Sequence, residues 1–347
     1  MHPPIKTALC SYGMSGKVFH GPLLRANPHF EVSHILERTK SLSKQDFPNA
    51  HIIRTFDELL AQDELELVVV NTPSPLHYEM AKASLEAGKH VVIEKPFAVT
   101  TKQCDELIAL SKSKQLHLSV YHNRRWDCDF KLIQKLIEEN KFGTIHQYEV
   151  HFNRFRPQLS PKVWKESSAL GGGILYDLGS HLIDQALVLF GTPKEVSAHL
   201  LQQRPATVTT DGFDINLRYD TTQVWLRASS FVMSPGPRIQ IHGEKGSLLK
   251  YGDDPQEKQL ISGMRPNDSG YGQSESPLKA TYTNAIETTN ITPPIGSYED
   301  FYKNIQEVIR NNAPPLVSTK SSRNVIRIIE LAQMSHDQKK VIPWTED

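Results

Sequence analysis

The most constraining feature of this sequence is a regular alternation of short apolar runs and amphipathic stretches over residues 5–120. The apolar runs have the length and β-branched content of buried strands. These runs are Ile5 to Leu9, Glu31 to Leu36, His51 to Arg54, Leu65 to Val70, His90 to Ile93 and His117 to Val120. Because helical patterns separate them, the strands should run parallel, with right-handed crossovers. The pattern predicts a doubly wound α/β domain with helices on both faces of a parallel sheet.

The alternation of strand and helix patterns ends after Val120. Strand signals follow one another from Lys194 to Tyr251 without intervening helices, which favours an open, mainly antiparallel sheet in a C-terminal α+β domain. Residues 252–297 are rich in Gly, Pro, Ser and Thr, and we expect them to form a long loop. Helices are expected at about Asp129 to Lys141, in an apolar stretch ending before Gly191, and at about Tyr298 to Asn311 and Ser321 to Gln338.

Charge and cysteine content exclude several classes of protein. The 39 Lys and Arg residues equal the 39 Asp and Glu residues, so no overall field favours nucleic acid. The three cysteines form no C-x-x-C pair, which argues against a disulfide framework or a zinc ribbon. The longest apolar run, Ala186 to Phe190, is far shorter than the roughly 20 residues of a membrane helix. We therefore expect a cytoplasmic protein with neither a membrane nor a nucleic-acid partner.

The first strand leads into a turn that resembles a dinucleotide-binding turn. Aligned to G-x-G-x-x-G, the sequence has Gly13 and Gly16 in the later places and Ser11 in the first. Gly13 would let the backbone approach a pyrophosphate, which the N-terminus of the following helix attracts. An ordinary strand-to-helix turn is the alternative, and the turn's place after the first of six strands favours the dinucleotide.

Two adjacent charges after the second strand give opposite indications about the cofactor. Glu37 lies near the position where an acidic residue binds the adenosine ribose of NAD. Arg38 beside it could hold the 2′-phosphate of NADP. Both could also be solvated loop charges, so the pair leaves the choice of cofactor open.

Two later strands end in residues with special chemistry or geometry. After the fourth, Ser74 suits a helix N-cap and Pro75 the first turn, and Gly88 is expected as the left-handed cap that ends this helix. After the fifth come Glu94 and Lys95, at the edge where open α/β sheets bind ligands. Lys95 could stabilise developing alkoxide charge, or the two could form an ordinary surface ion pair.

A glycine-rich segment, residues 171–173, leads into a second candidate for catalysis. Asp177 and His181 are four residues apart and would share one face of a helix. The carboxylate could then orient the imidazole, which is suited to remove a hydroxyl proton. A purely structural pair is the alternative. A metal site including His181, Asp177 and His122 stays open on spacing, although the histidines form no H-E-x-x-H motif and we expect no metal.

The segment Tyr121 to Asp127, with Phe152 to Arg156, concentrates hydrogen-bonding and aromatic side chains after the last strand. It could line a polar pocket for a polyhydroxylated ligand, or form a satisfied hydrogen-bond network between domains. The candidate substrate contacts here are His122, Asn123, Arg125 and Arg154.

Together these motifs resemble the glucose-fructose oxidoreductase, inositol dehydrogenase and rhizopine-catabolism (Gfo/Idh/MocA) family over essentially the whole chain. The marks are E-K-P at residues 94–96, T-P-x-x-x-H at 72–77 and G-G-G…D-x-G-x-H-x-x-D at 171–184. Y-H-N-R-R-W-D, F-N-R-F-R-P and K-Y-G-D-D-P-Q-E look like the NADP-dependent scyllo-inositol dehydrogenase branch. Ser11 and Glu37 depart from that pattern.

The resemblance implies a Rossmann domain at residues 1–121 and a substrate-binding and oligomerisation domain at 122–347, whose final helices can pack back on the first. It implies Lys95 as the catalytic lysine, Asp177 as its acidic partner and His181 as the acid/base. It also implies that NADP(H) is favoured over NAD(H), and that a homodimer or homotetramer forms through the C-terminal sheet. The full cofactor set is Ser11, Gly13, Gly16, Glu37, Arg38, Thr72, Pro73, His77, Glu94 and Lys95, and Tyr176 joins the substrate contacts.

The function expected from this reading is reversible hydride transfer between a nicotinamide dinucleotide and a secondary alcohol of a cyclic polyol or sugar. A noncatalytic dinucleotide sensor on the same fold is the first alternative. A metal-dependent lyase or isomerase that uses His181 is the second.

Overall fold

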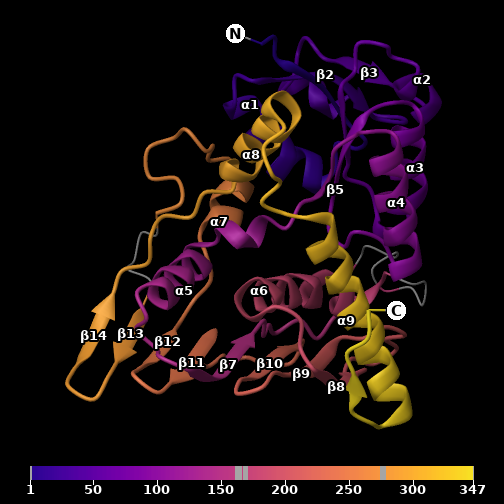
Figure 1. Ribbon diagram of the computed structural model, residues 1–347. Helices are drawn as coiled ribbons and strands as arrows, with labels where there is room; N and C mark the ends of the chain where they lie inside the picture. The colour runs from indigo at the N-terminus through magenta and orange to yellow at the C-terminus, as the bar shows by residue number, and fades with distance from the viewer. Residues whose placement is uncertain (1, 161–165, 167–170, 274–278, 347) are drawn as a thin grey trace. The chain divides into compact units, whose positions relative to one another are not determined.

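The computed structural model describes residues 2–160, 166, 171–273 and 279–346. The described chain forms two compact units, each assembled from separate segments (Figure 1). The first unit contains residues 2–126, 255–273 and 297–323, and the second contains the described parts of 127–254 together with 279–296 and 324–346. The units therefore do not follow a single cut in the sequence, because two later segments return to the first unit.

The first unit is built on the predicted parallel sheet, with strand order β3-β2-β1-β4-β5-β6. This order is that of a Rossmann fold, and it confirms the predicted doubly wound sheet. Its strands are β1 Ile5–Leu9, β2 Phe30–Leu36, β3 His51–Ile53, β4 Leu67–Val70, β5 His90–Ile93 and β6 Leu118–Val120. All neighbouring pairs run parallel, so the carboxyl ends of the six strands meet at one edge.

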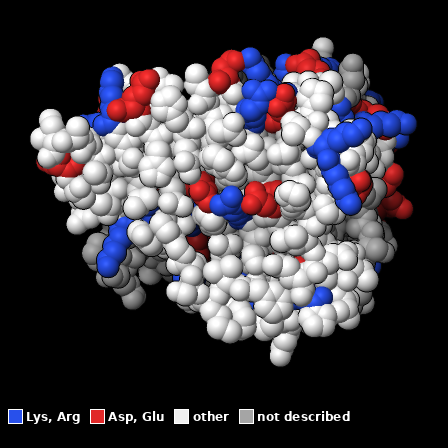
Figure 2. Space-filling model, turned by 90° about the horizontal axis from the view of Figure 1, so that it is seen from below, with Lys and Arg blue, Asp and Glu red and all other residues white. Residues whose placement is uncertain are grey.

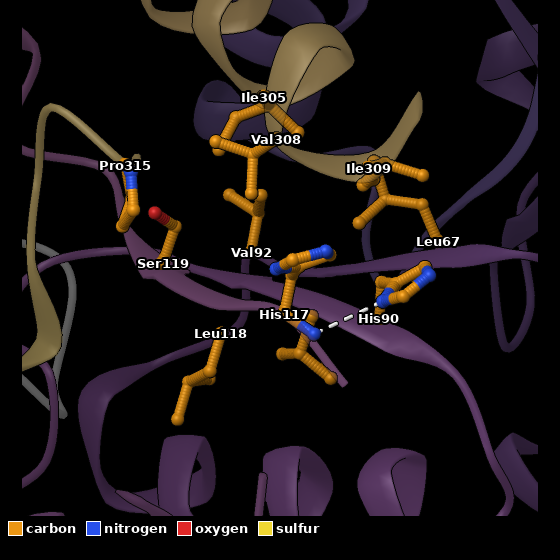
Figure 3. A pocket seen from close by; sticks show the side chains of 11 residues that line it. Leu67, His90, Val92, His117, Leu118, Ser119, Ile305, Val308, Ile309 and Pro315 are labelled. Carbon is orange, nitrogen blue, oxygen red and sulfur yellow. Dashed lines mark hydrogen bonds between the residues drawn. The ribbon is translucent and has the colours of Figure 1, made fainter. Parts of the chain in front are cut away.

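Helices from both the N-terminal and the C-terminal parts of the chain cover this sheet. Figure 3 shows helix α8 on one side of the strands, where Ile305, Val308 and Ile309 point toward the sheet. The helices of the unit are a π-helix Ser15–His20, α1 Gly21–Ala26, α2 Phe56–Leu60, α3 His77–Glu86, α4 Thr101–Ser113, α7 Gln256–Ile261 and α8 Glu299–Asn311. Short 3₁₀ turns cover Leu42–Gln45, Ser74–Leu76 and Asn123–Trp126.

The helix after β4 begins differently from the prediction. Ser74 opens a 3₁₀ turn, and α3 begins only at His77, with Leu76 as its N-cap. The prediction that Ser74 caps the helix directly was wrong, because the proline-rich segment forms a tighter turn first. The predicted left-handed cap is confirmed, since Gly88 has a φ of 78°.

The second unit is built on a nine-stranded sheet of order β14-β13-β12-β11-β7-β10-β9-β8-β15. Every neighbouring pair is antiparallel except β7 with β10, which confirms the predicted mainly antiparallel sheet. The strands are β7 Ile145–His151, β8 Glu195–Leu201, β9 Gly212–Arg218, β10 Gln223–Ser229, β11 Ile239–Gly243, β12 Ser247–Lys250, β13 Ala280–Thr283, β14 Thr288–Ile291 and β15 Ile342–Pro343. The helices are α5 Cys128–Glu138, a π-helix Leu175–Gly179 and α6 Ser180–Phe190. Helix α9, Thr319–Gln338, begins in the first unit and continues in the second.

The predicted long loop at residues 252–297 was wrong in its described part, because it contains α7, β13 and β14. Strand β13 extends the sheet beyond β12, and Tyr282 pairs opposite Leu248. The Tyr282 ring packs against Phe142, and its hydroxyl donates to the Lys141 carbonyl at 2.8 Å. A polar, threonine-rich segment therefore becomes a strand through one buried aromatic anchor and an available sheet edge.

The two faces of the nine-stranded sheet differ in character. Along β9 and β10 the buried residues alternate with partly exposed ones, so one face belongs to the core and the other carries Asn216, Gln223 and Trp225. Ion pairs join Arg227 to Glu149 and Asp214 on this second face. In the view from below, Figure 2 shows a broad surface on which charged side chains are sparse and a few of both signs lie together near its centre.

Candidate cofactor and catalytic site

The predicted cofactor residues gather at the carboxyl edge of the six-stranded sheet. Ser11 follows β1, Glu37 follows β2, Thr72 follows β4 and Lys95 follows β5. Strands β1 and β4 are neighbours, and the order in which successive strands are added to the sheet reverses between them. Open α/β sheets bind their ligands in the crevice at this switch point.

The turn after β1 has the open shape that a bound pyrophosphate needs. A Cβ atom added at Gly13 would meet no atom within 4 Å, so the space above this residue is free. A Cβ at Gly16 would lie 2.3 Å from the Ser11 carbonyl oxygen, so this position requires glycine. Ser11 donates its hydroxyl to the Asn71 carbonyl at 2.8 Å, and the Asn71 side chain bonds the Ser11 backbone in both directions. Ser11 therefore anchors the turn to β4, and the turn fits a dinucleotide.

Glu94 connects this turn to Lys95. Its Oε1 accepts a hydrogen bond from the Ser15 hydroxyl at 2.7 Å and lies 3.1 Å from His20 Nε2. Its Oε2 accepts from the backbone N–H of Lys95 at 3.0 Å. The other ring nitrogen of His20, Nδ1, lies 2.6 Å from the Tyr302 hydroxyl. One carboxylate thus holds both the start of the first helix and the backbone of the candidate catalytic lysine.

The charges in this network support one proton arrangement. Burial by itself raises the pKa of Glu94, but the hydrogen bond and charge of His20, followed by Lys95 and Ser15, lower it to about 2. Burial, followed by the charge of Glu94, raises the pKa of Tyr302 well above its ordinary value. Glu94 is therefore ionised and can accept a hydrogen bond from His20 Nε2, and Tyr302, which keeps its proton, lies against His20 Nδ1.

His77 joins the ends of β4 and β5. Its Nδ1 lies 2.7 Å from the Pro96 carbonyl oxygen and its Nε2 lies 2.9 Å from the Thr72 carbonyl oxygen. Burial lowers the pKa of His77, and the two carbonyl contacts oppose that effect. The residue is buried, so it bridges the T-P turn and the E-K-P turn from behind, and Thr72 and Pro73 stay half-buried at the edge.

Glu37 is buried, whereas Arg38 is exposed. The Glu37 carboxylate accepts hydrogen bonds from the backbone N–H groups of Leu42 and Ser43, both at 2.9 Å, and from the Ser43 hydroxyl. Its carboxylate therefore faces the protein's own loop. The two charges that sequence analysis could not rank are thus separated by the fold.

The predicted substrate residues fall into two groups. His122 and Asn123 are buried after β6 in the first unit. Arg125 in the same unit donates to the Leu316 carbonyl at 2.7 Å and to the Ser321 hydroxyl at 3.0 Å, which ties it to the segment between α8 and α9. Arg154 in the second unit stacks on Phe152, with its guanidinium carbon 4.7 Å from the ring centroid.

Asp177, His181 and the buried Tyr176 lie in the second unit, on one continuous helical stretch. Residues 175–179 form a π-helix that leads directly into α6, so Asp177 and His181 lie in successive segments of that stretch. Gly173 precedes it with a φ of 73°, and a Cβ there would meet the Thr210 carbonyl oxygen at 2.7 Å. The glycine run is therefore required by a close backbone contact, and π-helical turns are frequent at functional sites.

Among the described residues, no cluster of three or more His, Cys, Asp or Glu side chains is arranged to hold a metal ion. Cys128 is buried, and burial raises the pKa of its thiol, so it packs as a small residue. In the part of the chain that the structure describes, no helix is both long and apolar enough to cross a membrane.

A small apolar cavity lies at the opposite, amino end of the sheet (Figure 3). The first residues of β4, β5 and β6 line it from below, and α8 covers it. Inside it the rings of His90 and His117 stack with centroids 5.0 Å apart, and the His117 backbone N–H donates to His90 Nδ1 at 3.0 Å. This cavity holds none of the predicted site residues.

Sequence reasoning missed several residues that hold the site together. Asn71 and Ser43 are polar residues after or near strand ends, and their position at the carboxyl edge is a signal that could have found them. His20 and Tyr302 are 282 residues apart and had no shared signal. Arg54 was assigned to the end of a strand, whereas it donates to the loop after β2.

The chain is similar to known proteins over nearly its whole length. Residues 5–122 match the NAD-binding Rossmann fold of the Gfo/Idh/MocA oxidoreductase family, and residues 134–344 match its C-terminal alpha/beta domain. The scyllo-inositol 2-dehydrogenase (NADP(+)) IolW of Bacillus subtilis strain 168 is 42% identical over 342 residues, covering 97% of this chain and 95% of that protein. The uncharacterized oxidoreductase YdgJ of Escherichia coli K12 is 38% identical and covers 95% and 96%.

Two solved structures are similar to this chain over nearly its full length. The Bacillus subtilis protein yvaA has a TM-score of 0.94 at 41% identity, covering 99% of both chains. A protein from Bacteroides fragilis NCTC 9343 has a TM-score of 0.89 at 42% identity, covering 98% of this chain and 100% of that one.

Proposed function

The chain belongs to the Gfo/Idh/MocA oxidoreductase family, and from this premise we propose that it moves hydride between NADP and a secondary alcohol or ketone of a cyclic polyol or sugar. Scyllo-inositol is the leading candidate substrate, because the similar IolW protein is a scyllo-inositol 2-dehydrogenase that uses NADP. The observation that carries the proposal is the Glu94 carboxylate, which links Ser15 of the phosphate turn to the backbone of Lys95.

In the proposed reaction each residue has one task. During oxidation, His181 removes the hydroxyl proton, and Asp177 stabilises the imidazolium that results. Lys95 donates a hydrogen bond to the same oxygen and stabilises its negative charge as the carbonyl forms. A nicotinamide dinucleotide, which the turn at Gly13 and Gly16 would hold, would supply the acceptor for the hydride that leaves the carbon. The proton and the hydride therefore leave the alcohol by separate routes, and reduction reverses both.

Support for NADP over NAD comes from the loop after β2. The Glu37 carboxylate accepts three hydrogen bonds from residues 42 and 43, and Arg38 is exposed beside it. An exposed guanidinium suits a phosphate, whereas a carboxylate already bonded inside the protein is poorly placed for ribose hydroxyls.

A spectrophotometric screen at 340 nm tests the proposal, with inositols and aldoses as substrates and NADP and NAD in parallel. We expect turnover with at least one cyclic polyol, and faster turnover with NADP. Tight NADPH binding without turnover of any polyol or sugar would instead indicate the noncatalytic sensor. Activity that is lost on addition of EDTA and restored by a divalent metal would contradict the metal-free mechanism.

We also propose that two or more copies assemble through the partly exposed face of the nine-stranded sheet. Trp225 lies on this face between Asn216 and Glu149, and the Glu149 carboxylate is paired with Arg227. Aromatic side chains and arginine are enriched at protein interfaces. Light scattering of the wild type and of Trp225→Glu tests this. A monomeric wild type would contradict it, and so would an unchanged mass in a folded variant.

A further inference from the structure

We infer that Glu37 and Arg54 are positioning residues for the 2′-phosphate of NADP, and that Glu37 does not bind the cofactor ribose. This inference rests on the proposed use of NADP. Together the two residues hold the segment Arg38 to Ser41 at the carboxyl edge of the sheet, where its basic side chains can meet a phosphate dianion.

The Glu37 carboxylate is bonded within the loop that follows it. Both carboxylate oxygens accept hydrogen bonds, Oε2 from Leu42 and Oε1 from the backbone and hydroxyl of Ser43. An ionised carboxylate has roughly four acceptor positions, so three donors leave no room for the paired ribose hydroxyls that an NAD-binding carboxylate receives. The residue is 7% exposed and Ser43 is fully buried. Glu37 therefore acts as an anchor for residues 42 and 43.

Arg54 holds the same loop from the neighbouring strand. Leu36 of β2 pairs with Ile53 of β3, and the Glu37 N–H donates to the Ile53 carbonyl at 3.0 Å. Arg54 is therefore the next residue beside the start of the loop. Its guanidinium donates to the carbonyls of Glu37, at 2.6 Å, and Lys40, and to the Ser41 hydroxyl at 3.1 Å.

The charge of the loop fits a phosphate rather than a hydroxyl pair. Arg38 and Lys40 are exposed, and Arg54 adds a third positive charge. The only carboxylate within residues 37–41 is turned away and bonded to donors of residues 42 and 43. A phosphate monoester carries about −1.5 to −2 charges at neutral pH, so these cations select the cofactor that bears it.

The test is isothermal titration calorimetry of the full-length protein with NADPH and with NADH, using Glu37→Gln, Ser43→Ala and Arg54→Ala. Each variant should raise the Kd for NADPH by about tenfold, which is the loss of one to two charge-assisted hydrogen bonds. The Kd for NADH should change by less than about twofold, because NADH has no group that meets the loop. At saturating NADPH, kcat should stay unchanged, which a general loss of structure would not allow.

Glu31→Gln is the matched control, because it removes the same charge from the other, exposed end of β2. It should leave both Kd values unchanged. If Glu37 instead binds the ribose, Glu37→Gln will raise the Kd for NADH and lower the Kd for NADPH. That result overturns the inference and leaves the proposed use of NADP in place. Should Glu37→Gln fail to fold, Ser43→Ala decides alone, and an unchanged ratio of the two Kd values in this variant overturns the inference. A wild type that binds NADH as tightly as NADPH would contradict the proposed cofactor itself.

Discussion

The two ends of the six-stranded sheet use the same strands for different purposes. At the carboxyl end, Glu37 and Glu94 are held by hydrogen-bond donors from several elements. At the amino end, apolar side chains of α8 close over the strand starts, and the titratable groups that line the cavity are the imidazoles of His90 and His117 (Figure 3). The carboxyl end holds buried carboxylates, whereas the cavity at the amino end is lined by apolar side chains and two imidazoles.

This difference predicts which substitutions should affect activity and which should affect stability. Buried ionised groups contribute little net stability even when they are fully paired, because they lose their hydration. Buried apolar area stabilises the fold directly. A change at the carboxyl end that leaves Glu37 and Glu94 paired should therefore alter function at nearly constant stability. Truncation of apolar side chains at the amino end should do the reverse.

Lys95→Ala should have the largest effect on turnover. A loss of stability without a loss of turnover would contradict the proposed difference between the two ends of the sheet. We expect kcat to fall by about 10²- to 10³-fold, because one donor to the developing oxyanion is lost. The Kd for NADPH and the urea midpoint should stay nearly unchanged. Lys112→Ala, which removes an exposed lysine near the end of α4, is the control and should retain full kcat. Full activity in Lys95→Ala would remove this lysine from the mechanism.

Ile305→Ala tests the other end. Ile305 is 3% exposed and lines the cavity under α8. Its truncation should lower the free energy of unfolding by about 3 kcal/mol, and Ile305→Val by about 1 kcal/mol. Both variants should keep the wild-type kcat and Kd for NADPH when they are folded. Urea denaturation with activity assays below the transition measures this, and a selective loss of activity would show that the two ends are coupled.

His90 and His117 at the amino end of the sheet should make the stability of the protein depend on pH. Burial, followed by the charge of His117, lowers the pKa of His90 from 6.5 to about 4, with a smaller opposing effect of Glu66 and a further lowering by Arg310. Between these two values the unfolded chain binds the extra proton, so stability should fall as the pH drops from about 6.5 to about 4 and level off below.

Because one pKa unit corresponds to about 1.4 kcal/mol, the contribution of His90 over this range should be about 3 kcal/mol. His90→Asn keeps an acceptor for the His117 N–H and should show a shallower dependence of the free energy of unfolding on pH. An identical slope in wild type and variant would assign the acid sensitivity to other groups, such as His77, whose pKa is also lowered by burial.

Much of the first unit could be predicted because its signals are local. Period-two and period-3.6 patterns, with glycines at strand ends, located the parallel strands and placed Gly13 and Lys95 at one edge. The strands β13 and β14 were missed because their Thr-rich sequences have little hydrophobic alternation, and they form on the edge that β12 offers. Helix α8 was predicted at nearly its observed bounds, whereas its packing on the Rossmann domain was implied only by the family resemblance.

Local sequence was sufficient for the identity of the elements and for the chemical types at the strand ends, since both depend on residues within a few positions of one another. Tertiary structure alone decided what each charge does. Glu37 and Arg38 are adjacent and looked equally available, and only the position of Ser43 turned the carboxylate inward. Glu94 likewise depends on His20 and, beyond it, Tyr302, a contact across 282 residues. Side-chain direction follows from donors and acceptors brought together by folding, whether they lie six residues apart, as Glu37 and Ser43 do, or 282, as His20 and Tyr302 do.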